Sequence, residues 1–419
     1  MIRTVKDFDF ADKRVIMRVD FNVPMKDGKV QDDTRIMAAI PTIKCILEGK
    51  PRSLVLMSHL GSPYKDAQKA RKKAEDAGKH FDLEKYYNSK HRIKPVAEYL
   101  QAKLKVPVQS TTSCMGVKNI VEALPDSGIL MLENTRFHKE ETDKDITKQE
   151  VLAKELASYG DVYVNDAFGT AHRAHASTAT IAKFMSVCLG GLLMEKEVKY
   201  LEPMLKGPPK PMLAIIGGAK VSSKIGVLDS LLKNAASLII GGGMAYTFLK
   251  AQGHSIGKSL VEDDFLETAK KLLDDAKTKN VRIILPVDHL CSESFSADSN
   301  AIAVDNIDIP DNLMGMDVGK KTLELYKAEI KNAKSIVWNG PVGVFEFPAF
   351  AEGTSQVAHL VANSTEAGAL SIVGGGDSAA AVNKFNLSSK MTHVSTGGGA
   401  SLELLEGKEL AGIACLDRK

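Results

Sequence analysis

Cysteine is scarce in this chain, and no two cysteines stand close together. The 419 residues include five, at Cys45, Cys114, Cys188, Cys291 and Cys415, and none forms a C-x-x-C pair. An odd number of scattered cysteines argues against a disulfide framework and against a zinc site. We therefore expect a protein of a reducing compartment, with a cytoplasmic location.

Long apolar runs and a strong charge of either sign are also missing. No run approaches the roughly 18–20 apolar residues that span a bilayer, and the first ten residues carry charges without an apolar core. Lys and Arg number 55 against 52 for Asp and Glu, which leaves a net charge of +3. So small a net charge gives no general attraction to nucleic acid or to membranes, and any anion site must be local.

The two commonest phosphate-binding motifs are absent as well. A P-loop reads G-x-x-x-x-G-K-[ST], but the segment Gly257-Lys258-Ser259 has Gln252 where the first glycine should stand. No glycine cluster has the spacing G-x-G-x-x-G of a dinucleotide-binding turn. If the chain binds a nucleotide, it therefore uses a different cradle.

Short apolar runs alternate with segments of helical period along nearly the whole chain. Runs such as RVIMRVDF and PMLAIIGGAK predict buried strands, and VLAKELASYG and DDFLETAKKLLDDAK predict amphipathic helices. This alternation is typical of α/β folds with parallel sheets, and 419 residues favour two domains. We predict two doubly wound, Rossmann-like parallel-sheet domains joined by a helix and facing each other across a hinge cleft.

The domain boundaries follow from a linker. The stretch LLMEKEVKYLEPML, followed by Gly207, Pro208 and Pro209, predicts a helix that leaves one domain and a linker that enters the next. We predict a first domain over residues 1–188, a connecting helix and linker over 189–205, and a second domain over 206–403. Residues 404–419 are expected to return to the first domain.

A polar segment, residues 62–94, interrupts the first domain. From Lys65 to Lys94 it contains ten Lys or Arg against five Asp or Glu. One interpretation is a patch for RNA or membrane. The other, which we favour, is a solvated surface insertion without a part in catalysis.

Glycine clusters follow the strands of the second half, at 217–218, 241–243, 374–376 and 397–399. Glycine lets a backbone approach a phosphate closely, and the helix that follows offers free N–H groups. In GGAKVSSK, Lys220 and Lys224 are expected on one face of the first helical turns, where an anion would offset their repulsion, although plain solvation is the alternative. In GGGDSAAA, Asp377 either caps its helix or binds Mg²⁺, and the sequence leaves both open.

Charged and polar side chains follow the strands of the first half instead. Asp20 and Asn22 stand two residues apart, and Arg35 lies in the first turn of a predicted helix. Cationic candidates recur where strands end, and they are Arg35, His59, Arg136, His172 and Arg173. Guanidinium groups bind phosphate and carboxylate through paired hydrogen bonds, so a small, multiply charged anion is the expected ligand of this half.

The motifs taken in order resemble those of the phosphoglycerate kinase family. They are RVDFNVP, SHLG, LENTRF, DAFGTAHR, GGAKVSSKIGVL, GGGMAYTFLK, WNGPVGVFE, GGGDSAA and STGGGASLELLEGKELAG. The resemblance runs from about residue 14 onward, apart from residues 62–94. It implies a first domain that binds 3-phosphoglycerate or 1,3-bisphosphoglycerate, a second that binds ATP or ADP with Mg²⁺, and a monomer without nucleic-acid or membrane partners.

The resemblance also assigns site residues. The catalytic residues implied are Arg35, Lys220, Gly375 and Gly398. The substrate contacts implied are Asp20, Phe21, Asn22, Arg35, His59, Leu60, Gly61, Ser62, Arg136, His172 and Arg173. The nucleotide contacts implied are Gly218, Ala219, Lys220, Lys224, Gly242, Gly315, Asn339, Pro341, Gly343, Val344, Glu346, Gly375, Gly376, Asp377 and Ser378. Among these, Glu346 resembles the ribose-binding glutamate and Asp377 the magnesium ligand.

Two positions depart from the family pattern. Ser62 stands where the family usually has an arginine, so one charge-assisted contact worth about 1.5–3 kcal/mol is lost unless a Lys or Arg of residues 62–94 replaces it. Ser378 stands where threonine is common, and it keeps the hydroxyl group.

The chemistry implied requires no general base. A carboxylate acceptor with a pKa of roughly 4 is already ionised at neutral pH. Charge neutralisation and positioning then carry the transfer, and we expect closure of the two domains about the connecting helix to gate turnover. The alternatives are a nicotinamide-dependent dehydrogenase, which the missing G-x-G-x-x-G disfavours, and a nucleic-acid-binding module that uses residues 64–94.

Overall fold

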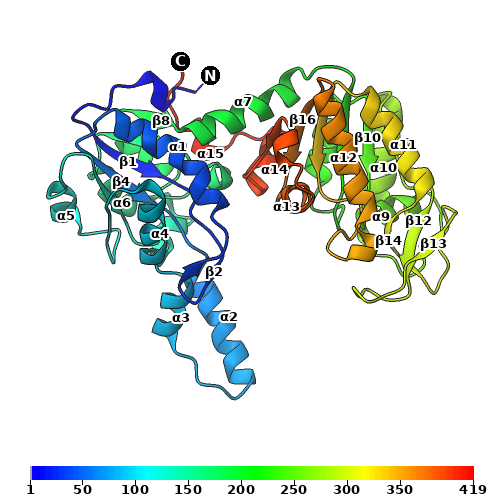
Figure 1. The fold of residues 1–419 in the computed structure, drawn as a ribbon, viewed down its shortest axis with the longest axis horizontal. Helices are drawn as coiled ribbons and strands as arrows, with labels where there is room; N and C mark the ends of the chain where they lie inside the picture. The colour runs from blue at the N-terminus through cyan, green and yellow to red at the C-terminus, as the bar shows by residue number, and fades with distance from the viewer. Residues whose placement is uncertain (1) are drawn as a thin grey trace. The chain divides into compact units, whose positions relative to one another are not determined.

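A computed structural model describes residues 2–419, and the chain divides into two compact units (Figure 1). The first unit comprises the chain up to Val198 together with Glu409–Lys419, and the second comprises Lys199–Lys408. Each unit is built around its own six-stranded sheet. Within residues 2–419, no helix combines the length and the apolar character that a membrane crossing requires.

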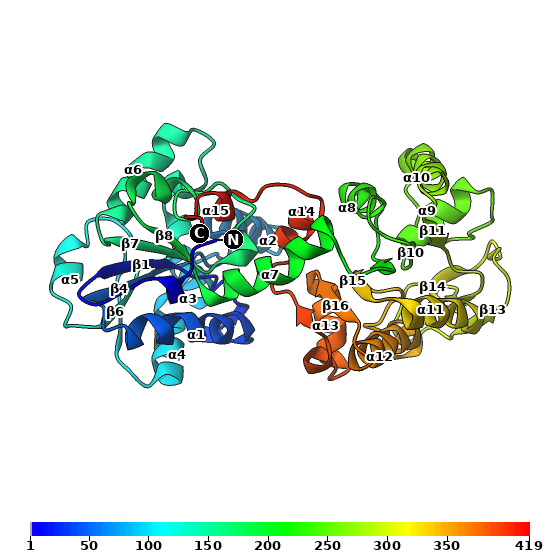
Figure 2. The same cartoon turned by 90° about the horizontal axis from the view of Figure 1, so that it is seen from above.

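The sheet of the first unit is entirely parallel. Its strands, in spatial order, are β5 (Val108–Ser110), β6 (Gly128–Met131), β4 (Ser53–Met57), β1 (Arg14–Arg18), β7 (Val162–Asn165) and β8 (Cys188–Gly190). Helices α1 (Thr34–Glu48) and α4 (Lys94–Leu104) cover one face, and α6 (Ile146–Ala157) lies on the other (Figure 2). The short helix α5 (Lys118–Glu122) connects β5 to β6.

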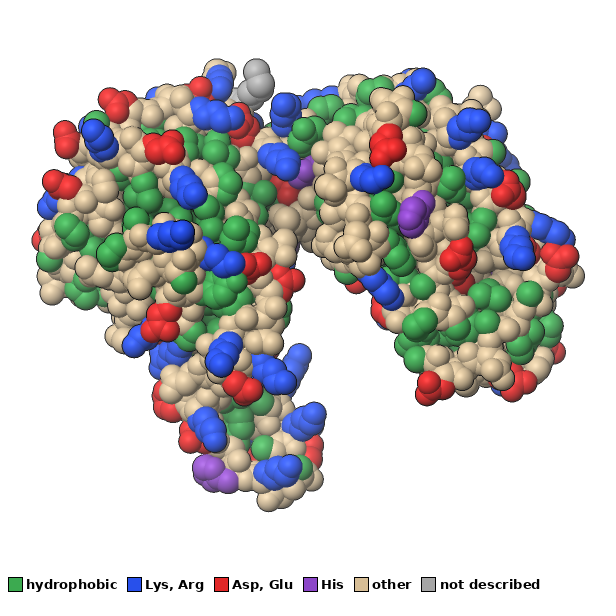
Figure 3. Space-filling model, in the orientation of Figure 1, with side chains coloured by type: hydrophobic (Ala, Val, Ile, Leu, Met, Phe, Trp, Pro, Cys, Tyr) green, Lys and Arg blue, Asp and Glu red, His purple; other side chains and the backbone are tan. Residues whose placement is uncertain are grey.

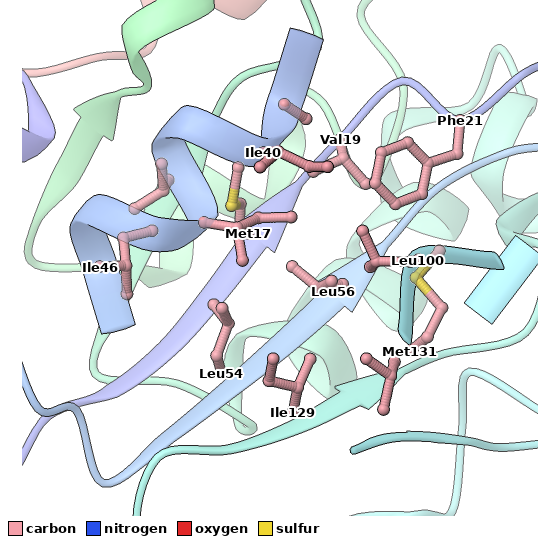
Figure 4. Close-up of a cluster of buried hydrophobic side chains, with 14 of the residues drawn as sticks. Met17, Val19, Phe21, Ile40, Ile46, Leu54, Leu56, Leu100, Ile129 and Met131 are labelled. Atoms are coloured by element: carbon pink, nitrogen blue, oxygen red, sulfur yellow. The ribbon is translucent and has the colours of Figure 1, made fainter. Parts of the chain in front are cut away.

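The core of the first unit follows from the two-residue period of its strands. Met17 of β1, Leu54 and Leu56 of β4, and Ile129 and Met131 of β6 point to the same side, toward α1 and α4 (Figure 4). Each of these five side chains is 2% exposed or less. Strands of this kind are buried on both faces, which is why their sequences are apolar without alternation.

The sheet of the second unit is also entirely parallel. Its strands, in spatial order, are β11 (Arg282–Ile284), β10 (Ser237–Ile240), β9 (Met212–Ile216), β15 (Ser335–Asn339), β16 (Leu370–Gly374) and β17 (His393–Val394). One face packs against α11 (Lys320–Asn332), α12 (Glu352–Glu366) and α13 (Gly376–Lys384). Helices α8 (Ile225–Leu231) and α10 (Leu266–Thr278) lie on the opposite face (Figure 2).

These two sheets confirm the predicted fold class of doubly wound parallel-sheet domains. A small antiparallel sheet was not predicted: β13 (Ile302–Val304), β12 (His289–Ser292) and β14 (Met314–Val318) pair beside the main sheet of the second unit. Helix α9 (Met244–Ala251) packs on this addition through Tyr246 and Leu249. Strands β2 (Met25–Lys26) and β3 (Lys29–Val30) form a hairpin that turns at Asp27-Gly28, a residue pair typical of tight hairpins, and both turn residues have positive φ.

Residues 62–94 form a helical arm on the first unit. The arm consists of α2 (Pro63–Asp76) and α3 (Leu83–Lys90), and its far end stands clear of the body of that unit (Figure 1). Lys and Arg side chains are scattered over its surface, with Asp and Glu side chains between them (Figure 3). The arm leads directly into α4.

Helix α7 (Leu192–Lys206) runs from the first unit into the second, and the chain later returns to the first unit. Helix α14 (Gly399–Leu405) belongs to the second unit, whereas α15 (Ala411–Ala414) belongs to the first. The returning segment is tightly bound, because the Asn165 side-chain amide donates to the Gly412 carbonyl at 3.0 Å. The Asp417 amide also donates to the Cys188 carbonyl at 2.8 Å, beside β8.

Candidate active site

Polar side chains meet beyond the carboxyl edge of the first sheet, where β1 and β4 end. The Arg35 guanidinium, in the first turn of α1, lies 3.2 Å from an Asp20 carboxylate oxygen and donates to the Asn22 carbonyl at 3.0 Å. The Asn22 side-chain oxygen accepts from the Gly61 amide at 2.8 Å. Arg35, Asp20, Asn22 and Gly61, which the sequence separates, therefore form one connected group.

His59 lies behind this group in a buried position, beside a buried arginine. Its Nδ1 is 3.2 Å from Nη2 of Arg18, and both side chains are 2% exposed or less. A guanidinium only donates hydrogen bonds, so Nδ1 accepts and Nε2 carries the ring proton. Burial and the charge of Arg18 hold the pKa of His59 well below its ordinary value of 6.5. The prediction that His59 adds positive charge is therefore wrong, since the ring is neutral at physiological pH.

A cavity of about 540 Å³ opens beside these residues. It is lined by Ser62, Pro63, Tyr64, Lys65, Arg136, Thr142, Arg173 and His175. None of these side chains is a carboxylate, while three are permanently cationic at neutral pH. A cavity with this lining favours an anionic occupant.

Arg136 experiences the mutual repulsion of the positive charges gathered here. Its Nη1 donates to the Gly61 carbonyl at 2.8 Å and to Oγ of Ser62 at 3.2 Å, whereas its buried Nε has no hydrogen-bond partner. Burial, followed by repulsion from Arg173 and Arg18, lowers its pKa to about 10. A bound phosphate or carboxylate would relieve that repulsion.

The structure brings some predicted substrate residues to this cavity and places others behind it. Ser62, Arg136 and Arg173 line it. His172 lies next to them and accepts a hydrogen bond from Arg173 at 3.2 Å. Phe21 and Leu60 are buried, at 0% and 1% exposed, and neither lines the cavity. Their backbone amides donate to the side chains of Ser58 and Asn134.

Sequence reasoning missed five residues of this lining, namely Pro63, Tyr64, Lys65, Thr142 and His175. The second histidine of the segment TAHRAHAST was visible in the sequence, but nothing distinguished it from its neighbours. His175 is held neutral, because burial and the charges of Arg136, Arg18 and Arg173 lower its pKa to about 3.

A second cavity, of about 520 Å³, opens on the second unit. It is lined by Gly218, Ala219, Gly242, Gly243, Tyr246, Lys258, Leu260, Phe295, Met314, Gly315, Met316, Pro341, Gly343, Val344, Glu346 and Asp377. One part is apolar, and the remainder consists of glycine turns with one cationic side chain, Lys258, and two carboxylates, Glu346 and Asp377. Apolar walls with a few polar groups are typical of a site for a ring system that carries charged groups.

Two different physical reasons explain why glycine occupies positions in these turns. At Gly217 a Cβ would lie 2.1 Å from the Pro341 carbonyl oxygen, and at Gly242 it would lie 2.7 Å from the Gly218 amide nitrogen, so packing excludes a side chain. Gly376 differs, because no atom lies within 4 Å of its Cβ position and its φ is not positive. Neither packing nor backbone conformation requires glycine at this position. A glycine without either reason is expected where the backbone must approach a bound ligand closely.

Lys224 reaches the end of β15, where it forms a hydrogen bond with the Asn339 side-chain oxygen. Burial lowers its pKa, while the nearby charges of Asp377 and Glu406 act in the opposite direction. The Asn339 amide donates to the Gly374 carbonyl at 2.8 Å, and the buried Ser378 hydroxyl accepts from the Gly340 amide at 2.6 Å. These contacts hold the glycine turns after β15 and β16 together.

The prediction for the two lysines of GGAKVSSK is wrong in its geometry. Helix α8 begins only at Ile225, so Lys220 and Lys224 both precede it and share no helical face. Lys220 is exposed, whereas Lys224 is half-buried. The two side chains therefore have separate environments, and mutual repulsion along a helix does not apply.

The predicted nucleotide residues fall into two groups. Those that line the cavity are Gly218, Ala219, Gly242, Gly315, Pro341, Gly343, Val344, Glu346 and Asp377. Those that lie outside its lining are Lys220, Lys224, Asn339, Gly375, Gly376 and Ser378. Gly398, expected in catalysis, is the N-cap of α14 and has a positive φ and open space at its Cβ position.

Three of the lining residues that the sequence did not reveal come from the unpredicted part of the second unit. Met314 and Met316 belong to β14 of the antiparallel sheet, and Phe295 follows β12. Lys258 comes from the Gly257-Lys258-Ser259 segment, which fails as a P-loop but still reaches this cavity.

Asp377 fits a magnesium ion that is shared with phosphate groups. The N-cap of α13 is Gly375, so the capping alternative for Asp377 is wrong. Asp377 is exposed at the cavity, and no cluster of three metal-binding side chains occurs in residues 2–419. Mg²⁺ commonly takes a single carboxylate together with phosphate oxygens and water, so one aspartate suffices.

Two doubly wound units with these two kinds of cavity define a two-domain α/β phosphotransferase. The comparisons specify the family. The sequence model described as Phosphoglycerate kinase matches residues 5–408. The chain belongs to the phosphoglycerate kinase family, whose members are phosphotransferases with a carboxyl group as acceptor.

Individual relatives agree over the full length. The chain is 58% identical over 417 residues to phosphoglycerate kinase of Treponema pallidum, covering 100% of both chains. It is 50% identical over 420 residues to that of Borrelia garinii, again covering 100% of both. Among solved structures, phosphoglycerate kinase from Coxiella burnetii matches with a TM-score of 0.84 and 42% identity, covering 99% of this chain and 98% of that one. The structure from Pyrococcus horikoshii gives a TM-score of 0.78 at 32% identity over the same shares. None of these comparisons supports the dehydrogenase alternative.

Proposed function

We propose that this chain catalyses reversible, magnesium-dependent phosphoryl transfer between ATP and the carboxylate of 3-phosphoglycerate, which yields ADP and 1,3-bisphosphoglycerate. The observation that carries the proposal is the contrast between the two cavities. The cavity of the first unit is cationic and free of carboxylates, as a substrate with both a phosphate and a carboxylate group requires. The cavity of the second unit combines apolar walls with glycine turns, as a nucleotide requires.

In the first unit, Arg136 and Arg173 bind the anionic substrate, with Ser62 and His172 beside them. Arg35, oriented by Asp20 and the Asn22 carbonyl, stands where it can stabilise the transferring phosphoryl group. His59 is a neutral residue in this scheme, so its part is to position Arg18 rather than to supply charge.

In the second unit, the apolar side chains receive the base and Glu346 binds the ribose. The turns that carry Gly218, Gly376 and Gly398 receive the phosphates, because each has open space at the Cβ position. Lys224 and Lys220 supply positive charge near these turns. Asp377 would hold Mg²⁺, which neutralises charge on the phosphate oxygens when it is bound.

The chemistry then rests on positioning and charge. The acceptor carboxylate is ionised at neutral pH, so no side chain has to remove a proton before attack. Arg35, Lys220 and the backbone amides near Gly375 and Gly398 neutralise the charge that spreads over the phosphoryl oxygens in the transition state. Preorganised donors of this kind cost no reorganisation during the reaction.

Transfer also requires the two substrates to meet, and we propose that the units close about helix α7 to bring this about and to exclude water. Small-angle scattering should then show a smaller radius of gyration with both substrates than with either one. Substitutions that stiffen the chain within residues 195–205 should lower turnover and leave nucleotide binding intact. An unchanged radius with both substrates bound would contradict closure. We also propose that the enzyme is a cytoplasmic monomer and that its only partners are small molecules.

A crossed binding experiment tests the assignment of one substrate to each unit. Arg136→Ala should weaken binding of 3-phosphoglycerate about 10- to 150-fold, because a charge-assisted hydrogen bond contributes about 1.5–3 kcal/mol. It should leave ADP binding unchanged, while Glu346→Ala should do the reverse. Arg52→Ala, which removes an exposed arginine paired with Asp126, is the matched control. Loss of ADP binding in the Arg136 variant would show that the assignment is wrong.

A further inference from the structure

The helical arm of residues 62–94 reaches the cationic cavity with its first turn. Ser62, Pro63, Tyr64 and Lys65 all line that cavity, although they belong to a segment expected to be inert. Ser62 is the N-cap of α2 and Pro63 occupies its first position. The positive end of this 14-residue helix therefore lies at the cavity, which adds to its affinity for anions.

The base of the arm is held firmly against the strand-end segment that carries Arg136. The Tyr64 hydroxyl donates to the Phe137 carbonyl at 2.8 Å. The Phe137 ring in turn packs edge-on against Tyr87 at 5.1 Å, and the Arg92 guanidinium lies over it at 4.7 Å. The first turn of α2 is thus fixed relative to Phe137, the immediate neighbour of Arg136.

A second set of contacts joins the arm to the loop after β4. The Asn134 side-chain amide donates to the Leu60 carbonyl at 2.7 Å and to the His91 carbonyl at 3.0 Å. Nδ1 of His91 lies 3.1 Å from the same Leu60 carbonyl. A solvated insertion would not need such buried connections, so the arm has a defined position beside the cavity.

Lys65 is the cation that the arm contributes. It is exposed, and in residues 2–419 it forms no ion pair with any carboxylate. The nearest acidic neighbour in sequence, Asp66, accepts from the Ser62 amide at 2.9 Å and lies 3.8 Å from Nε2 of His91. Its carboxylate is therefore engaged elsewhere and is not part of the cavity lining.

We propose that Lys65 is a substrate-binding residue of this enzyme and that it binds the phosphate group of 3-phosphoglycerate together with Arg136 and Arg173. The inference rests on the function proposed above and adds a residue to it. Three observations on the cavity support it: Lys65 lines it, no carboxylate neutralises it, and Arg136 keeps a buried Nε without a partner. The arm is then part of the substrate site, and Lys65 supplies a positive charge in the same lining as Ser62, whose side chain carries none.

Lys65→Met tests the proposal, because methionine keeps most of the length and removes the charge. The variant should raise the KM for 3-phosphoglycerate about 10-fold and weaken its equilibrium binding to the full chain to a similar extent. It should change the KM for ATP and the kcat less than twofold. Lys65→Arg should keep the KM for 3-phosphoglycerate within about threefold.

Lys69→Met is the matched control, since Lys69 lies one helical turn further along α2, is exposed and does not line the cavity. It should leave every constant unchanged. A Lys65→Met enzyme with a KM within twofold of the unmodified enzyme would overturn the proposal, and so would an equal rise in the Lys69→Met enzyme. Failure of the proposed function itself is separable, because Arg136→Ala would then also leave 3-phosphoglycerate binding unchanged.

Discussion

Asp166, which follows β7, should make the stability of this protein depend on pH near neutrality. Its side chain is fully buried, and one carboxylate oxygen accepts from the Leu193 amide at 2.9 Å and from the Met194 amide at 3.1 Å. These are the free N–H groups of the first turn of α7. Burial raises the pKa of Asp166 from 3.8 to about 7, although these hydrogen bonds and one from Thr42 act in the opposite direction.

The sign of the effect follows from the raised pKa. Between about pH 4 and pH 7 the folded state keeps a proton on Asp166 that the unfolded state has lost. The free energy of unfolding therefore falls as the pH rises through this range, by about 1.4 kcal/mol for each pH unit. From about pH 5 to pH 7 this single carboxyl group should cost about 2–3 kcal/mol, and the loss should level off above pH 7.

Asp166→Asn isolates this contribution, because the amide keeps the acceptor oxygen and cannot ionise. The measurement is the free energy of unfolding in urea at several pH values, for the variant and the unmodified protein side by side. The stability of the variant relative to the unmodified protein should increase by about 2–3 kcal/mol from pH 5 to pH 7. A difference that stays constant with pH would refute the reasoning, since Asp166 would then titrate alike in both states.

Three further predictions concern the second unit. Gly217→Ala should lower the free energy of unfolding by about 2 kcal/mol or more, because its Cβ would lie 2.1 Å from the Pro341 carbonyl oxygen. Gly376→Ala, which has open space at its Cβ position, should leave the urea midpoint of unfolding unchanged. Equal urea midpoints for the two variants would argue against the packing account. The same Gly376→Ala enzyme should show a raised KM for ATP, and an unchanged KM would remove Gly376 from the phosphate site. Asp377→Asn should raise the Mg²⁺ concentration for half-maximal activity about tenfold. Lys224→Met should leave that Mg²⁺ concentration unchanged and lower kcat. An unaltered magnesium dependence in the Asp377 variant would contradict the role of Asp377 as a magnesium ligand.

The strands and the main helices were predictable because their signals are local. Apolar runs such as residues 14–21 and 211–216 became β1 and β9, and the helical period of residues 263–277 became most of α10. The hairpin at Asp27-Gly28 depends on two adjacent residues that tolerate positive φ. Short stretches of sequence are enough to predict both burial on the two faces of a sheet and the type of a turn.

The electrostatic state of the site was not predictable in the same way. His59 is neutral because it is buried and because Arg18, 41 residues away in sequence, lies against it; both lower its pKa. Lys220 and Lys224 differ in burial because α8 begins one turn later than the sequence suggested. Both outcomes depend on which groups the fold brings together, and spacing along the chain does not contain that information.

The lining of the cavity in the second unit was also only partly predictable from sequence. Its glycine turns were recognisable from sequence, whereas its apolar wall draws on Phe295 and Met314 from the antiparallel addition. Those segments carry weak strand signals and no motif. Tertiary contacts alone give them a place at the site.

The segment Glu409–Lys419 has a consequence for the order in which the protein assembles. The Asn165 amide and the β8 backbone at Cys188 are satisfied by residues 247 and 229 positions later, after the whole second unit has been made. A nascent first unit therefore leaves the ribosome without the Gly412 contact to Asn165 and without the Asp417 contact to β8. Its last native contacts form only once the intervening 199–408 unit has been synthesised, so the part of the protein that is translated first is completed last.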